Sequence, residues 1–218
     1  MATRTPAGAR TRAARLDPVE RRAQLLALGL RMLSSESPDR VPVDEIAEAA
    51  GISRGLLFHY FPTKRDFYVA VAQEAARQLL AVTAPDPALQ HMDRLHASLA
   101  AYVDFVAENE ALYVALVRGA AGSDSELQAI SEETRSESAR RVIEALGMHD
   151  PDPAVRMAAR GWVGFIEETT LDWLRNRDLD RDQLLSVQKQ VLVHALEAAV
   201  ACSMSPPRRP GERRRSQR

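Results

Sequence analysis

Cationic and hydroxyl-type hydrogen-bond donors are concentrated in a short segment near the N-terminus. Within residues 54–64, Arg54, His59, Tyr60 and Lys64 supply a guanidinium, an imidazole, a phenol and an ammonium group. Cations and hydroxyls bind phosphate oxygens, and a guanidinium also matches the O6 and N7 acceptors of guanine. The donor set therefore predicts contacts to double-stranded DNA.

Other groupings that could do chemistry lack the required spacing. His91 and His96 are five residues apart, whereas a helical metal-binding pair is spaced by four. The acidic runs at 149–152 and 178–182 fall between predicted helices, where Asp is expected as an N-cap. The single cysteine, Cys202, has no cationic activator nearby in the sequence. We therefore expect no catalytic residue, no metal site, no cofactor and no enzyme.

A helix-turn-helix must position the donors. A short helix over 43–50 ends at Gly51, and Ser53 can cap a second helix that runs to about Tyr60. The residues that would pack at the crossing of the two helices are apolar and partly small: Ile46, Ala47, Ala50, Ile52 and Leu57. The residues left exposed for entry into a major groove are Ser53, Arg54, Gly55, Leu56, Phe58 and His59.

Simpler roles compete with some of these assignments. Tyr60 and Phe61 are also compatible with a hydrophobic core, and His59 with an ordinary surface position. Lys64 differs, because a cation in the first turn of a helix opposes the helix dipole. Its position therefore points to an external anion.

The run 57–61 (LFHYF), the turn at 50–53 and the trailing Lys64 give residues 18–68 a recognisable pattern. This segment resembles the N-terminal domain of the TetR family of bacterial transcriptional regulators. The resemblance implies base contacts by Arg54, Gly55 and Phe58, and phosphate contacts by His59, Tyr60 and Lys64. Two residues depart from the family pattern: Phe58 stands where tyrosine is usual, and Pro42 where a capping threonine is common.

Capping signals divide the chain into helices. Asp17 with Glu20, and Thr63 with Asp66, are capping-box patterns that start helices at 18 and 64. The helices predicted beside the helix-turn-helix cover 18–33, 64–82, 89–107, 110–120, 124–146, 153–176 and 181–202. We predict an all-α chain in four parts: a disordered basic arm (1–16), a three-helix helix-turn-helix DNA-binding domain (17–66), an effector-binding and dimerisation bundle (67–202) and a disordered basic tail (203–218).

The predicted bundle carries large or polar side chains on otherwise apolar helix faces. Each is also compatible with core packing, but together they predict a mostly apolar cavity with few polar anchors, which favours a lipophilic or amphipathic effector. The candidate effector-binding residues are His96, Tyr102, Phe105, Tyr113, Arg118, Trp162, Phe165, Glu168 and Thr169.

The last predicted helix is apolar on more than one face, including Val187, Val191 and Val200. A terminal helix cannot bury two faces against its own bundle, so we expect a homodimer interface there. Gly161 and Gly164 in the preceding helix predict the close approach of another helix or a ligand.

Charge is distributed unevenly along the 218 residues. Residues 1–65 contain 11 Lys and Arg against 7 Asp and Glu, residues 66–202 contain 12 against 22, and residues 203–218 contain 6 against 1. The basic ends indicate a partner different from that of the acidic middle. The arginines at 10, 12 and 15 are compatible with a minor-groove arm and with a tail that attracts DNA non-specifically.

No apolar run reaches the ~20 residues of a membrane span, and no signal peptide is recognisable at the N-terminus. We expect a cytoplasmic homodimer with no membrane partner: a repressor released from a palindromic operator by a small effector. Two alternatives stay open. One is a non-specific architectural DNA-binding protein, and the other is a helical ligand-binding protein with a vestigial DNA-binding domain.

Overall fold

The computed structural model describes residues 17–36, 40–119 and 124–204. Within these ranges the chain forms nine helices and no strand, which confirms the predicted all-α fold. None of the described helices is long and apolar enough to cross a membrane. The predicted arm, the tail from residue 205 onward and the residues 120–123 lie outside the described part of the chain.

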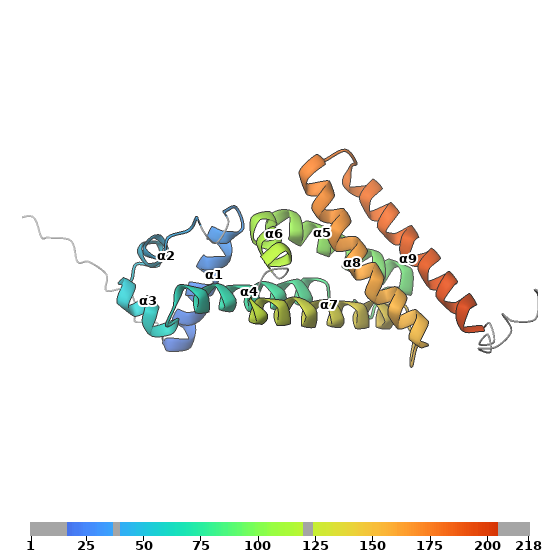
Figure 1. Ribbon diagram of the computed structural model, residues 1–218, viewed down its shortest axis with the longest axis horizontal. Coiled ribbons are helices and arrows are strands. Elements are labelled where there is room, and N and C mark those ends of the chain that lie inside the picture. The colour runs from blue at the N-terminus through green and yellow to red at the C-terminus, as the bar shows by residue number, and fades with distance from the viewer. Residues whose placement is uncertain (1–16, 37–39, 120–123, 205–218) are drawn as a thin grey trace, which may run out of the picture.

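The helices divide the molecule along its long axis (Figure 1). One end consists of α1 (Pro18–Leu33), α2 (Val43–Ala49) and α3 (Arg54–Tyr60). From there α4 (Lys64–Val82) runs beside α7 (Ser125–Ala145), with α5 (His91–Glu108) and α6 (Glu110–Gly119) packed against this pair. The antiparallel pair α8 (Pro153–Asn176) and α9 (Arg181–Met204) forms the opposite end.

Local capping explains why the predicted helix ends agree with the structure to within two residues. Asp17 Oδ1 accepts from the Glu20 amide at 2.8 Å, and Glu20 Oε2 accepts from the Asp17 amide at 3.1 Å. Thr63 and Asp66 exchange the same two bonds. Pro42 gives α2 no side-chain cap. The largest differences are two residues: α5 begins at His91 where residue 89 was predicted, and α9 continues to Met204 where residue 202 was predicted.

Two apolar cores lie along the chain. The first joins α1 to α4 through residues such as Leu25, Ile46 and Phe67, and α6 adds Leu112 to it. The second joins α5 to α9 and includes Leu79 near the end of α4. Because α4 contributes to both cores, it connects the N-terminal helices to the bundle.

The helices α1 and α4 approach closely at Gly29. A Cβ atom on Gly29 would lie 2.6 Å from Val71 Cγ2 and 2.7 Å from Phe67 Cζ. Contacts this short are not tolerated in a close-packed interior. This glycine is therefore required by packing within the chain.

Candidate nucleic-acid interface and internal cavity

The helices α2 and α3 form the predicted helix-turn-helix. Ile46 and Leu57 are buried at their crossing, and Gly51 turns the chain with a φ of 65°. This left-handed conformation favours glycine because it has no Cβ. Ser53 Oγ then accepts from the Leu56 amide at 3.2 Å and caps α3. The crossing fixes which side of α3 faces outward.

Most of the predicted DNA-contact residues lie on that outward face. The exposed ones are Ser53, Arg54, Gly55, Leu56 and His59, whereas Phe58, Tyr60 and Lys64 are half-buried. Phe61 turns inward, where its ring meets Phe67 edge-on at 5.1 Å, so its alternative assignment to the core is confirmed.

Arg54 has a partner within the chain that the sequence did not reveal. Its Nη1 donates to both carboxylate oxygens of Asp44, at 3.0 and 3.2 Å, and its guanidinium lies 5.3 Å from the centre of the Phe58 ring. The Arg54 and Asp44 side chains are 60% and 65% exposed. Exposed pairs of this kind contribute only ~0–1 kcal/mol, so Arg54 can exchange Asp44 for a base at little cost.

Lys64 also has an internal partner. Its Nζ lies 5.2 Å from the centre of the Tyr68 ring, whose negative face attracts a cation. The ring gives a second reason for a lysine at this position, and the predicted phosphate contact of Lys64 stays a prediction. Lys64 begins the helix that follows α3 directly.

Gly55 contrasts with Gly29. A Cβ atom on Gly55 would find open space, with Ser53 Oγ the nearest atom at 3.9 Å. No packing contact among the described residues requires glycine here, although glycine destabilises a helix relative to alanine. The open space is compatible with the predicted close approach of DNA at Gly55, which stays a prediction.

A cavity of about 120 Å³ lies inside the bundle, walled by α4 to α8. That is roughly ten times the ~10–15 Å³ that one water molecule needs on the same measure. Its lining is mostly apolar and includes four of the nine predicted effector-binding residues: Tyr102, Phe105, Tyr113 and Trp162.

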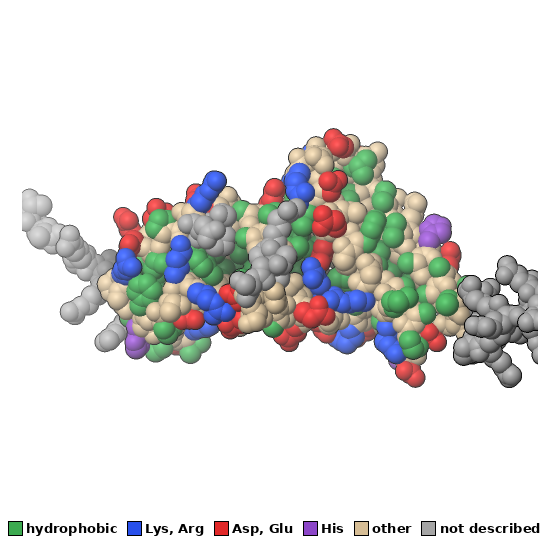
Figure 2. All heavy atoms as spheres, in the orientation of Figure 1, with side chains coloured by type: hydrophobic (Ala, Val, Ile, Leu, Met, Phe, Trp, Pro, Cys, Tyr) green, Lys and Arg blue, Asp and Glu red, His purple; other side chains and the backbone are tan. Residues whose placement is uncertain are grey.

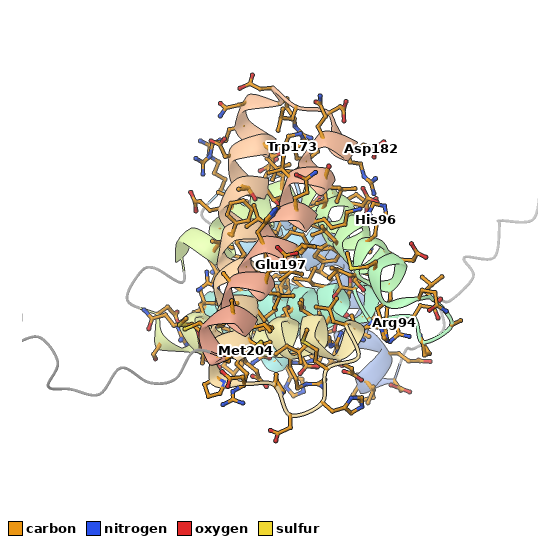
Figure 3. The ribbon with its side chains drawn as sticks, turned by 90° about the vertical axis from the view of Figure 1, so that its right-hand side faces the viewer. Arg94, His96, Trp173, Asp182, Glu197 and Met204 are labelled. Atoms are coloured by element: carbon orange, nitrogen blue, oxygen red, sulfur yellow. The ribbon has the colours of Figure 1, made fainter. Side chains whose placement is uncertain are left out.

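The other predicted effector-binding residues do not line this cavity. Glu168 and His96 are exposed, and Figure 3 shows His96 at the outer edge of the bundle. Phe165 and Thr169 are half-buried outside the lining, because consecutive residues on a helix point ~100° apart and the adjacent Ile166 faces the cavity. The side chain of Arg118 lies outside the described part of the structure.

Polar residues that the sequence did not single out also line the cavity. Arg135 of α7 donates from Nε to both oxygens of Glu167 on α8, at 2.7 and 2.9 Å. Burial raises the pKa of Glu167, although Arg135 opposes this shift. The hydroxyls of Tyr102 and Tyr113 lie 2.6 Å apart, and burial raises the pKa of both. Both tyrosines are therefore neutral hydrogen-bonding groups at neutral pH.

A second ion pair ties the bundle to the N-terminal end. Arg65, in the first turn of α4, donates from Nε and Nη2 to the two oxygens of Asp124, each at 2.8 Å. The hydrogen bond from Arg65 lowers the pKa of Asp124 to about 2. Asp124 also caps α7 by accepting from the amides of Glu126 and Leu127. The start of α7 is thus fastened to the start of α4.

Known proteins match both halves of the chain. Residues 25–71 match the model of "Bacterial regulatory proteins, tetR family", and residues 91–195 match "Tetracyclin repressor-like, C-terminal domain". A tetR-family transcriptional regulator from Streptomyces coelicolor is 32% identical, with a TM-score of 0.75 over 86% of this chain and 83% of that one. The chain belongs to the TetR family. The resemblance recognised in the sequence is thereby confirmed, and the protein is a transcriptional regulator with a helix-turn-helix.

Two further relatives of this TetR-family regulator have more specific names. The HTH-type transcriptional activator FasR of Mycolicibacterium smegmatis is 27% identical over 187 residues, covering 81% of this chain and 83% of that protein. The crystal structure of FadR from Bacillus subtilis in complex with stearoyl-CoA has a TM-score of 0.61 at 20% identity, over 80% of this chain and 97% of that one. At this identity the second similarity concerns the fold alone.

Proposed function

We propose that this regulator is a homodimeric repressor that binds a palindromic operator in the cytoplasm and is released by an apolar or amphipathic effector. The observation that carries the proposal is the position of α4. Ala72, Ala75 and Ala76 of this helix wall the cavity, and the same helix starts at the Arg65–Asp124 tie beside α3. A ligand that displaces α4 would therefore move the recognition helix.

The described residues make a second route from the cavity to the N-terminal end. Leu112 and Leu116 of α6 line the cavity and also pack into the apolar core of α1 to α4. The amide of Ala111 donates to the carbonyl of Ser34 at 3.1 Å. A ligand in the cavity would thus displace both α4 and α1.

The surface of α8 and α9 supports a dimer. Met157 is 72% exposed on α8, and Val187 and Val200 of α9 are 46% and 43% exposed. Apolar side chains lie along the face of α8 and α9 that is turned to the viewer in Figure 2. Cβ atoms on Gly161 and Gly164 would meet nothing within 4 Å, so none of the described helices packs closely against them. The sequence predicted the close approach of another helix or a ligand there, and a second copy would supply such a helix in an isologous interface.

The decisive experiment is selection of genomic fragments by the purified protein, followed by footprinting. We expect one protected site with two half-sites about 34–36 Å apart, since two recognition helices would enter successive major grooves. A reporter driven from that site should be silenced by the protein and restored by the effector. Protection without a defined sequence would favour the architectural alternative, and absence of DNA binding the ligand-binding one.

Activation is the second candidate for the direction of control. It is favoured by the 27% identical relative, which is named an activator. The same reporter separates the two directions, because an activator would raise transcription from the bound site. The contacts of α3 would be the same in either case.

A further inference from the structure

The lining of the cavity contains unused hydrogen-bond donors at one place. Arg135 contacts Glu167 through Nε alone, and within the described part of the chain neither of its Nη atoms has a hydrogen-bond partner. A guanidinium has five N–H donors and no acceptor. Four donors of this arginine are therefore left for another molecule.

Neighbouring groups share the donor character. The hydroxyls of Tyr102 and Tyr113, 2.6 Å apart, belong to residues that line the same cavity as Arg135. A pair of hydroxyls can turn one hydrogen toward an added acceptor. Ser98 Oγ, which belongs to another lining residue, is buried without a hydrogen-bond partner among the described residues.

The two arginines of the cavity lining differ in how they are paired. The lining contains Arg135, Arg141 and one glutamate, Glu167. Arg141 is already engaged, because it donates to Glu137 and to the carbonyl of Leu80. The side chains of Arg135 and Glu167 remain 29% and 14% exposed, so this end of the cavity is still reached by water. A charged head group there would keep part of its hydration while an apolar tail fills the interior.

We infer that the effector is an amphipathic anion whose carboxylate-type head pairs with the Nη atoms of Arg135 beside Tyr102 and Tyr113, with Glu167 as the competing anion. This rests on the proposal that the cavity is the effector site. Arg135 is the recognition residue, and Glu167 weakens recognition because it occupies the same guanidinium. Arg135 therefore raises the affinity for the anionic effector, and its ion-pair partner Glu167 lowers it.

Three probes with one ten-carbon chain test the head group: decanoate, decanol and decylammonium. Binding is followed by calorimetry and by tryptophan fluorescence in a Trp173→Phe background, where Trp162 in the cavity wall is the fluorophore. Decanoate should bind at least about tenfold more tightly than decanol, as expected for charge-assisted hydrogen bonds, and decylammonium should bind most weakly. Arg135→Gln should abolish the preference for decanoate and leave decanol within twofold. Arg140→Gln, on the same helix but outside the cavity lining, should change neither.

The Glu167→Gln variant gives the sharpest result. It should strengthen decanoate binding by about tenfold, whereas loss of an ion pair needed only for structure would weaken it. Because Arg135→Gln removes the partner of the half-buried Glu167 carboxylate, the double variant Arg135→Gln/Glu167→Gln serves if the single variant does not fold. The double variant too should lose the preference for decanoate.

The outcomes separate this inference from the proposed effector site. Equal binding of decanoate and decanol, or preferred binding of decylammonium, would overturn the anionic head and keep the cavity as a binding site. If none of the three probes binds, the inference of an anionic head is overturned, whereas the proposed regulator is still tested separately by footprinting and the reporter.

Discussion

The proposed DNA-reading face, which is the outward side of α3, and the proposed effector cavity are built in different ways. The face is made by one short helix, α3, whose outward residues follow from its caps and from the burial of Leu57. The cavity is made by five helices, and its charged pair joins residues 32 positions apart in the chain. A local surface can be read from a motif, whereas a cavity depends on how distant helices pack.

The largest expected effect on DNA binding is at Arg54, on the outward side of α3. Arg54→Ala should weaken binding to the operator by about 1–3 kcal/mol and relax specificity at one base pair in each half-site, because a bidentate contact to guanine is lost. Competition binding on operator and random DNA measures this. Asp44→Asn is the matched control: it frees the same guanidinium and should not weaken binding. Equal losses on both DNAs would exclude a base contact.

Substitution of Gly55 tests the proposed DNA-reading face directly, because the stability of the fold and the affinity for DNA should change in opposite directions. Gly55→Ala should raise the free energy of unfolding by up to ~0.5–1 kcal/mol, since alanine fits the open space and favours helix. DNA affinity should fall, since the added methyl group would hold α3 out of the groove. Denaturant melts and binding titrations on one preparation test both signs.

Gly29→Ala is the control variant for Gly55→Ala. It should destabilise the fold by about 1–3 kcal/mol, because its Cβ would overlap Val71 and Phe67. If Gly55→Ala leaves DNA affinity unchanged, the missing side chain at 55 has no role in the groove.

The same contrast explains what the sequence could and could not predict. Capping residues such as Asp17 and Thr63 act on their own helix, so the helix ends were predictable. Arg135 was missed because its neighbours in the cavity wall, Thr134 and Ser138, are polar. Polar residues stand out in a sequence only where the rest of the helix face is apolar. The spacing of Thr134 and Ser138 predicts that they share one face of α7, but only the packing of α7 on α8 shows that Arg135 meets Glu167.

A smaller effect is expected at Lys64. Lys64→Ala should lower the slope of log affinity against log salt by about one unit, because one phosphate contact and its released counterion are lost. Arg77→Ala, further along α4 and paired with Glu74, should leave the slope unchanged. An unchanged slope in Lys64→Ala would mean that this ammonium group serves only the Tyr68 ring.

The smallest expected effect is at the tie between the two regions. Arg65→Gln should leave effector-free DNA affinity within about twofold but reduce the effector-induced loss of affinity by a few-fold, because α7 would no longer move α4 through Asp124.

The depressed pKa of Asp124, about 2, means that its contribution to stability is fully present above the ordinary carboxyl pKa of ~3.9 and is lost as pH falls through about 2. Acid unfolding of the wild-type protein should therefore be steeper in this window than that of Arg65→Gln. If the variant keeps the full effector response, the signal does not pass through Asp124 but through α4 itself or through the apolar contacts of Leu112 and Leu116.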